Sequence, residues 1–327
     1  MRRPLLSYAA VVLLLLAAAY VSATTGSIKL APGRLLHGLL FGGDEQAAVI
    51  RDLRLPRIVV SMLVGAALAV SGVLLQAVMR NPLADAGVIG VSSGAGLVSL
   101  VFVTVFPALF FWLPVFAFLG GALACALVYA LSWQSGLSPI RLVLIGIAVN
   151  ATFTGLGQSF NYRGSYAVTS VNQATTSIFT LKTWDDVRSM ALYGLVGLLL
   201  AALLASWCNL LAMPDRTARN LGLPVVRARL IVSAVAVLLA ASATAIGGLI
   251  AFVGLLVPHT ARILVGSDHR TLIPFSALAG ALLLLVADTL GRTLLAPTEI
   301  PASILMTVIG GPFFIFLLRK SGRIYGS

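Results

Sequence analysis

Long apolar runs separated by short polar stretches recur along the whole chain. A helix needs roughly 20 apolar residues to cross about 30 Å of hydrocarbon, and most of the runs have about this length. The pattern predicts ten spans, at residues 5–24, 57–79, 92–107, 112–133, 139–160, 190–212, 228–247, 249–265, 272–292 and 300–318. The third and eighth runs are short, and the seventh and eighth meet at Gly247-Gly248, so nine spans are the alternative.

The predicted fold class is all-α, a polytopic bundle of about ten transmembrane helices that fills residues 1–327 as a single domain. A backbone in lipid must satisfy its own hydrogen bonds, and these runs are too long and too uniformly apolar for barrel strands. Residues 81–96, NPLADAGVIGVSSGAG, depart from the pattern because they are rich in Gly, Ser and Pro. We expect a broken or re-entrant segment there, buried in protein.

The composition agrees with a membrane protein. Of 327 residues, 59% are hydrophobic and only 10% are charged, whereas a soluble domain carries about 25% charged residues. A net charge of +12 would suggest a nucleic-acid partner in a soluble protein, but here the cations occupy short loops between spans, so no nucleic acid is expected. Cys125 and Cys208 stand alone inside apolar runs, which supports neither a disulfide framework nor a metal cluster.

The loop charges also predict an orientation. If the N-terminus is cytoplasmic, ten spans return the C-terminus to the cytoplasm, and most of the 22 Lys and Arg residues then lie inside, as the positive-inside rule requires. The alternative for the first run is a cleaved signal peptide, since Arg2-Arg3 precede an apolar run that ends in Val21-Ser22-Ala23. That run is long for a signal peptide, and its removal would leave an odd number of spans.

Four arginines lie near the outer ends of predicted spans, where the positive-inside rule predicts few cations. They are Arg51, Arg54, Arg57 and Arg292. One interpretation is that they reach to lipid headgroups or pair with Asp52 and Asp288, the latter one helical turn from Arg292. The other is that an acidic partner docks from outside, because the arginine fork matches carboxylates.

Several blocks of this sequence resemble one family in the same order. LRLPR (53–57), VGAALAVSGVLLQAVMRNPLADAGVIGVSSGAG (64–96), ARNLGL (218–223), GLIAFVGLLVPHTARILVGSDHR (248–270), ADTLGRTLLAPTEIP (287–301) and IGGPFFIFLLRK (309–320) are similar to the FecCD-type permeases. These are membrane subunits of ABC importers for iron-siderophore complexes, heme and cobalamin. The match runs from about residue 50 to the C-terminus.

The resemblance implies a set of partners in the bacterial cytoplasmic (inner) membrane. A second permease subunit, identical or homologous, would pair with this chain around a central path in the lipid. Two cytoplasmic ATPase subunits would drive transport, and a periplasmic or lipid-anchored binding protein would deliver the cargo. In this family, arginines at the positions of Arg54, Arg57 and Arg292 receive glutamates of the binding protein.

The cytoplasmic loop from Met213 to Arg229 is the predicted contact with an ATPase. Its string PDRTARNLGLPVVRAR contains cations, and Gly222 and Pro224 are suited to end a short helix. Without the resemblance, these residues fit equally well an ordinary cytoplasmic connection whose cations follow the positive-inside rule. The resemblance implies a coupling helix, whose core we expect to consist of Ala218, Leu221, Gly222 and Leu223.

No energy-converting chemistry is expected in this chain, which is therefore not an enzyme. A phosphate-binding loop needs G-x-x-x-x-G-K-[ST], but Lys29, Lys182 and Lys320 do not follow a glycine. The three histidines lie far apart without the spacing of a metal site. We expect no catalytic residue, no metal and no cofactor here, with ATP and Mg²⁺ bound by the partner ATPase.

Two spans carry stripes of small and polar residues that predict the translocation path, although close helix packing explains such stripes equally well. The resemblance favours a path, because the fifth and tenth spans border it in this family. The stripes consist of Gly146, Asn150, Thr154, Gly157 and Asn161, and of Ser303, Thr307 and Gly310. A path without charges suits a bulky cargo and argues against an ion channel.

The expected cargo is an iron(III)-siderophore complex, with heme and then cobalamin as alternatives that the residues do not separate. The stretch 161–186 is expected outside, where Tyr162, Arg163 and Tyr166 would meet an anionic or aromatic cargo or lie in a solvated loop. A rival class is a secondary transporter without an ATPase. It would need a coupling carboxylate inside the membrane, and Asp288 is the candidate.

Overall fold

The computed structural model describes residues 2–25, 33, 44–87, 89–132, 139–163, 179–296 and 298–322, and these residues form helices and connecting turns without a strand. The long helices are α1 (Arg2–Thr24), α4 (Leu55–Met79), α5 (Val91–Val105), α6 (Leu113–Ser132), α7 (Pro139–Arg163), α9 (Trp184–Leu203), α12 (Val225–Gly247), α13 (Val253–Val265), α14 (His269–Thr293) and α15 (Ala302–Gly322). The short ones are α3 (Glu45–Val49), a π-helical turn (Ile50–Arg54), a 3₁₀ segment (Pro107–Trp112), α10 (Ala205–Leu211) and α11 (Asp215–Asn220). The predicted all-α class is confirmed.

The helices match the predicted spans one by one, with differences in length. Among the described residues, seven helices are long and apolar enough to cross a membrane. The shorter apolar helices are Val91–Val105, Val253–Val265 and Ala302–Ile315, which correspond to the third, eighth and tenth predicted spans. The third and eighth were expected to be short, whereas the tenth was not.

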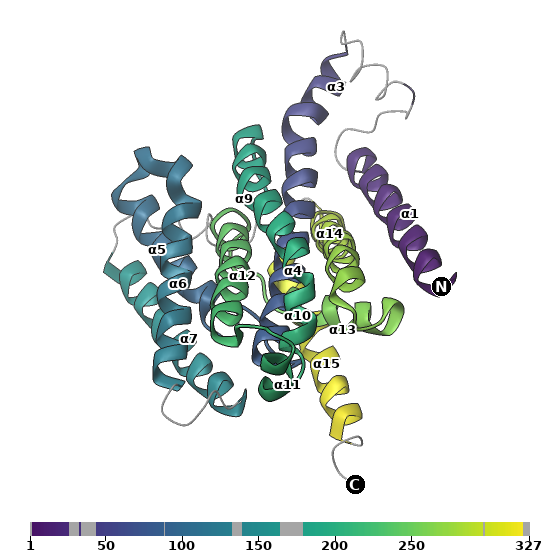
Figure 1. Cartoon of the computed structure of the whole chain (residues 1–327). Helices are drawn as coiled ribbons and strands as arrows, with labels where there is room; N and C mark the ends of the chain where they lie inside the picture. Colours follow the sequence, from purple (N-terminus) through teal and green to yellow (C-terminus); the bar gives the residue numbers. More distant parts are fainter. Residues whose placement is uncertain are drawn as a thin grey trace.

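Helix α4 forms the centre of the bundle (Figure 1) and is buried along most of its length. It packs against α14, α12, α9 and α13. The contact with α14 is very close at Gly65 and Gly280, where a Cβ on either glycine would overlap the carbonyl oxygen of the other. Helices α5, α6 and α7 lie on one side of the centre and α1 on the other (Figure 1), where α1 contacts mainly α14.

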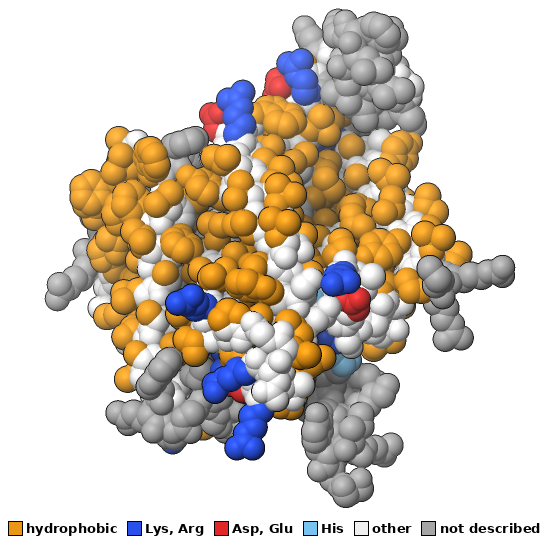
Figure 2. All heavy atoms as spheres, in the orientation of Figure 1, with side chains coloured by type: hydrophobic (Ala, Val, Ile, Leu, Met, Phe, Trp, Pro, Cys, Tyr) orange, Lys and Arg blue, Asp and Glu red, His pale blue; other side chains and the backbone are white. Residues whose placement is uncertain are grey.

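Hydrophobic side chains cover the face shown in Figure 2 between two ends that carry charged groups. Large hydrophobic side chains are exposed on several helices, among them Leu13 and Leu16 of α1, Leu123 of α6 and Leu199 of α9. Such an apolar belt has no favourable contact with water and is satisfied by lipid. The arrangement is that of a multi-pass membrane protein.

Two interruptions of the helices lie inside the bundle. Arg80 ends α4 in the left-handed conformation with φ 47°, and turns follow up to Gly90. Ala84, Asp85 and Ile89 are buried there, which confirms the prediction of an irregular segment enclosed by protein in its first part, whereas residues 91–96 of the predicted segment form the start of α5. The second interruption separates α12 from α13, so the seventh and eighth predicted spans are two helices.

The prediction of one continuous span over 190–212 was wrong: the helix begins earlier, and two helices cover the region. Helix α9 begins at Trp184, because Thr183 and Asp186 form a capping box in which each side chain accepts the other's backbone N–H. The helix ends at Leu203, and α10 follows after Leu204. The apolar run alone does not reveal a cap that lies before its first apolar residue.

Candidate functional site

The arginines predicted at the outer ends of spans come together at one end of the bundle, here called the arginine end. Arg57 of α4 donates from Nη2 to Asp288 Oδ1 at 2.8 Å and from Nε to Asp288 Oδ2 at 2.9 Å. Its Nη1 lies 2.9 Å from Glu299 Oε2, which also accepts from the Thr180 hydroxyl at 2.7 Å. The side chains of Arg57 and Asp288 are only 12% and 3% exposed. Arg57 is therefore held between two carboxylates of its own chain.

Arg292 and Arg54 are directed toward the end of α1 instead. Arg292 donates to the hydroxyl of Ser22 at 2.7 Å, to the Ser22 carbonyl, and to the Thr25 carbonyl at 3.1 Å. Arg54 donates to the Ala23 carbonyl at 3.1 Å. The expected pairing of Asp288 within the chain is confirmed, but with Arg57 rather than with Arg292. Asp52 pairs with Arg51 at 3.0 Å, and both side chains are exposed.

Glu299 lies between α14 and α15 and completes the arginine end. Burial raises the pKa of this carboxyl, but the hydrogen bond from Thr180 and the charge of Arg57 outweigh burial and hold the pKa below its ordinary value. Glu299 is therefore ionised near neutral pH and gives the Arg57 side chain a second negative partner.

The loop 213–229 forms α11 at the opposite end, here called the α11 end. Gly222 has φ +84°, and the N–H groups of Leu223 and Gly222 donate to the carbonyls of Ala218 and Arg219 at 3.0 and 2.9 Å. These two bonds define a Schellman motif, which requires a residue without a Cβ penalty at Gly222. The prediction that Gly222 ends a short helix is confirmed.

The four predicted core residues of this loop have different environments. Ala218 and Leu223 are buried, as the Schellman motif favours, whereas Leu221 is 58% exposed. Of these four, Leu221 is the apolar side chain that projects from the end of the bundle.

Asp215, the first residue of α11, ties the loop to two long helices. Its Oδ1 lies 3.1 Å from Arg80 Nη2 at the end of α4 and 2.8 Å from Arg229 Nη2 in α12. Asp215 therefore connects α11 to the C-terminal end of α4, from which the irregular segment follows, and to the start of α12.

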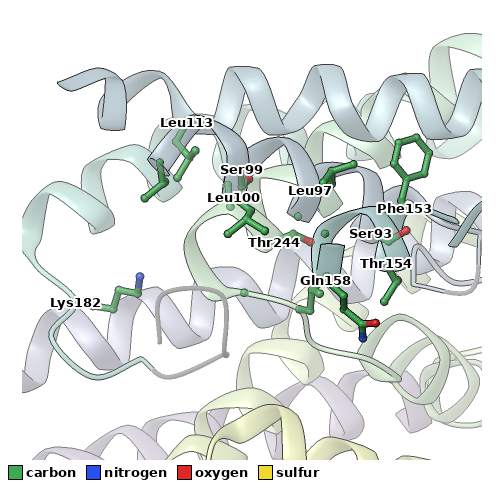
Figure 3. Close-up of a pocket in the computed structure, with 16 residues that line it drawn as sticks. Ser93, Leu97, Ser99, Leu100, Leu113, Phe153, Thr154, Gln158, Lys182 and Thr244 are labelled. Atoms are coloured by element: carbon green, nitrogen blue, oxygen red, sulfur yellow. The ribbon is translucent and has the colours of Figure 1, made fainter. Parts of the chain in front are cut away.

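A cavity of about 260 Å³ opens between α5, α7 and the end of α12 (Figure 3). Most of its lining is aliphatic or aromatic, with Leu97, Leu100 and Phe153 among the side chains shown. Polar groups come from Ser93, Ser99, Thr154, Gln158, Thr244 and Lys182. It is named the Lys182 cavity below.

A second cavity, of about 620 Å³, lies nearer the α11 end and is named the Asp85 cavity. Asn81, Asp85, Phe252 and Phe314 contribute to its lining. Ser93, Thr154 and Leu249 line both cavities, so the two adjoin one another. Together they extend from Lys182 at the arginine end to Asn81 just beyond α4.

Only part of the predicted path lines these cavities. Asn150, Thr154 and Gly157 do so, whereas Gly146 is buried, and the Asn161 side chain lies outside the described part of the chain. In α15, Ser303 and Thr307 are absent from both linings, and Gly310 is covered by the Phe252 ring. Among the described side chains of α15, Phe314 faces the Asp85 cavity.

Asp85 and Phe252 were not singled out from the sequence, although they join the two interrupted segments. The Asp85 carboxylate accepts from the N–H of Ala86 at 2.9 Å and from the N–H groups of Phe252 and Gly87. Phe252 has φ 69°, which is uncommon for a residue with a Cβ. Residues 247–254 contain three glycines, and this composition could have predicted a turn here.

Metal-binding and cysteine chemistry have no support in the part of the chain that is described. No group of three His, Cys, Asp or Glu side chains lies close enough there to hold a metal ion. Cys125 and Cys208 are free and buried in the core. Of the loop 161–186, the stretch that holds Tyr166 and the side chains of Tyr162 and Arg163 lie outside the described residues.

Known proteins resemble this chain over nearly its whole length. It is 40% identical over 318 residues to the "Probable heme-iron transport system permease protein IsdF" of Staphylococcus aureus strain MSSA476, covering 97% of both chains, and equally similar to that of strain Newman. A solved metal-chelate type ABC transporter in an inward-facing conformation has a TM-score of 0.82 at 30% identity, with 97% of this chain and 99% of that chain covered.

A more distant structure shares the fold alone. PsaBC from Streptococcus pneumoniae in complex with Fab has a TM-score of 0.61 at 15% identity, covering 88% of this chain and 95% of that chain.

Residues 13–320 match the FecCD transport family. With the helical bundle described above, this chain belongs to the FecCD transport family and is the permease of an ABC importer, not an enzyme, its ATPase being a separate subunit.

Proposed function

We propose that this permease carries heme across the bacterial cytoplasmic membrane after delivery by an extracytoplasmic binding protein. The single observation that carries the proposal is the pair of adjoining cavities, which run along α5, α7 and the α12–α13 interruption. Their largely apolar walls suit the flat apolar ring of heme, and scattered hydroxyl and amide groups suit its polar edge.

The relatives favour heme over the siderophore expected first from the sequence. The IsdF proteins named above are heme-iron permeases by name and share 40% of their residues with this chain. Ferric siderophores present many polar atoms, which a largely aliphatic wall leaves without partners. An iron(III)-siderophore complex is the second candidate, and cobalamin the third.

Two chains are needed to enclose the path, because α7 and α15 leave large apolar side chains uncovered. Leu144, Ile147 and Leu156 of α7 and Val308 of α15 are exposed in the single subunit. A second permease subunit, identical or homologous, covers part of this surface, and membrane lipid covers the rest. Each permease is a single transmembrane domain over residues 1–327.

In this proposal the α11 end lies in the cytoplasm, and the N- and C-termini are cytoplasmic as well. Arginines collect there, namely Arg80, Arg141, Arg216, Arg219, Arg227, Arg229, Arg262 and Arg270, and this distribution supports the assignment by the positive-inside rule. Leu221 docks into the ATPase, one for each permease, while the buried Ala218 and Leu223 and the turn at Gly222 hold Leu221 in position. ATP and Mg²⁺ bind to the ATPase and not to this chain.

The arginine end then faces the binding protein. Acidic groups of that protein approach Arg54, Arg57 and Arg292, which lie together and influence one another electrostatically. Because Glu299 already occupies one edge of Arg57, a docking carboxylate competes with Glu299 for this guanidinium. This competition links docking to the connection between α14 and α15.

A secondary transporter is disfavoured by the environment of Asp288. A coupling carboxylate must be able to exchange its proton or ion with water, but Asp288 is almost fully buried in an ion pair with Arg57. The carboxylate is therefore committed to holding α4 against α14.

The test is the uptake of radiolabelled iron by bacterial cells with and without this gene, supplied as hemin and separately as ferric siderophores. We expect hemin uptake to be lost on deletion and restored by the wild-type gene, with siderophore uptake unchanged. Loss of siderophore uptake alone would overturn the heme assignment. Loss of neither would overturn both assignments and direct the test to cobalamin.

A further inference from the structure

Lys182 brings a cation to the edge of a cavity whose walls are otherwise neutral. Figure 3 shows its side chain at one edge of the Lys182 cavity, with Thr154 and Phe153 at the far side. The other described residues in this lining carry no charge. Lys182 belongs to the short connection before α9, so its backbone lies outside the membrane-spanning helices.

Among the described residues, the Lys182 ammonium has one acidic neighbour, Asp186, and only a loose contact with it. The distance from Nζ to Asp186 Oδ1 is 3.7 Å, which is too long for a good hydrogen bond. The other carboxylate oxygen, Oδ2, accepts from the backbone N–H and hydroxyl of Thr183 at 2.9 and 3.1 Å. Asp186 is thus engaged mainly in capping α9.

Burial makes such a loosely paired ammonium costly. The Lys182 side chain is only 16% exposed, and burial lowers the pKa of its ammonium, opposed by the nearby charge of Asp186. An ammonium has three donors, and a buried cation is stable only when it is paired and hydrogen-bonded. In the nearby exposed pair, by contrast, Arg188 Nη1 lies 2.9 Å from Asp185 Oδ1, which is hydrogen-bonding distance.

We propose that Lys182 is a cargo-binding residue that receives a carboxylate of the metal chelate as it enters the Lys182 cavity. This inference rests on the proposed function and deepens it. For heme the carboxylate is a propionate, while the ring lies against Leu97, Leu100 and Phe153. The cargo thus enters with its charged edge toward the arginine end.

The experiment uses the complete transporter in lipid nanodiscs and measures hemin binding by the change in heme absorbance. Hemin dimethyl ester, in which both propionates are neutral, is the matched probe. The variants are Lys182→Gln, Lys182→Arg, which keeps the charge, and Arg188→Gln, a control that removes a cation from exposed α9 surface outside the cavity.

We expect Lys182→Gln to weaken hemin binding about tenfold, the loss of one charge-assisted hydrogen bond. Lys182→Arg and Arg188→Gln should bind hemin like the wild type, and Lys182→Gln should bind the dimethyl ester as the wild type does. Unchanged hemin binding by Lys182→Gln would overturn the inference. Equal weakening for hemin and its ester would also overturn it, because that result indicates altered packing rather than lost charge recognition.

Failure of this inference is distinguishable from failure of the proposed function. Normal hemin uptake by wild-type cells together with unchanged binding by Lys182→Gln would reject only the role of Lys182. Absence of hemin uptake by wild-type cells would reject heme as the cargo. Uptake of a carboxylated siderophore that Lys182→Gln slows about tenfold would then retain Lys182 as a carboxylate-binding residue.

Discussion

The guanidinium of Arg57 meets the carboxylate of Asp288 edge to edge, with Nη2–Oδ1 and Nε–Oδ2 distances of 2.8 and 2.9 Å. Both side chains are largely buried. The pair joins α4, the central helix, to α14 at the arginine end, while Gly65 and Gly280 allow the same helices to touch farther along. Arg57 thus contributes to the architecture as well as to the surface where a binding protein is proposed to dock.

Replacing Asp288 by alanine should destabilise the protein by about 3 kcal/mol, because it leaves a buried guanidinium with one remaining acidic partner. Thermal unfolding of the purified transporter in nanodiscs measures the effect. The control is Asp185→Ala, which breaks an exposed pair with Arg188 and should change stability little. Equal unfolding temperatures for the two variants would show that the Arg57–Asp288 pair does not stabilise the bundle.

Charge reversal at Arg54 should weaken docking of the binding protein without unfolding the permease. We expect Arg54→Glu to lower its affinity about tenfold, mainly by slowing association, since a surface charge steers the encounter. Surface plasmon resonance at two salt concentrations tests both affinity and charge dependence. Arg57→Glu should lose affinity and stability together, because it places an acid against Asp288. Wild-type affinity for Arg54→Glu would remove this arginine from the docking surface.

Leu221→Asp should separate the permease from its ATPase. The side chain is exposed, so the fold should persist, while an apolar anchor at the centre of an interface contributes at least about 2 kcal/mol, or roughly thirtyfold in affinity. Co-purification of the ATPase measures assembly. Leu181→Asp changes an exposed leucine at the arginine end and serves as the control. Normal recovery of the ATPase with Leu221→Asp would contradict the coupling assignment.

Removing the Asp85 carboxylate should loosen the joint between the two interrupted segments. Asp85→Ala leaves buried N–H groups of Ala86 and Phe252 without their acceptor, which costs about 1–3 kcal/mol for each unsatisfied group. Hydrogen exchange of residues 248–252 should become faster, because Phe252 is no longer held at its positive φ. Asp85→Asn keeps a carbonyl acceptor and should show a smaller effect. Unchanged exchange in Asp85→Ala would indicate that Gly254 and its packing fix this turn alone.

The sequence predicted where the helices lie but not which side chains pair between helices. Apolar runs predicted where each long helix lies, although the run 190–212 missed the start of α9 and its end at Leu203. Gly247-Gly248 and the 81–96 stretch indicated where the two interruptions lie, and the sequence left open whether the first of these separates two spans. Helical spacing suggested that Asp288 faces Arg292, since they are four residues apart on one helix. In the folded chain Arg57 reaches Asp288 from a different helix, and Arg292 turns to Ser22, contacts that local periodicity does not encode.

The cavity residues illustrate the same limit. Asn150, Thr154 and Gly157 could be chosen because their spacing places them on one helical face. Lys182 and Asp85 lie in non-helical segments, where no periodicity assigns a direction to a side chain. Their proximity to the path depends on contacts with α5, α7 and α13, which only the folded chain brings together.

The most direct test of the account is ATP-dependent transport by the complete system reconstituted in liposomes. Radiolabelled hemin, presented with the binding protein, should accumulate inside only when ATP is available to the ATPase, and the Leu221→Asp permease should accumulate none. Accumulation without ATP, or undiminished accumulation by Leu221→Asp, would contradict the account and favour a transporter that works without an ATPase.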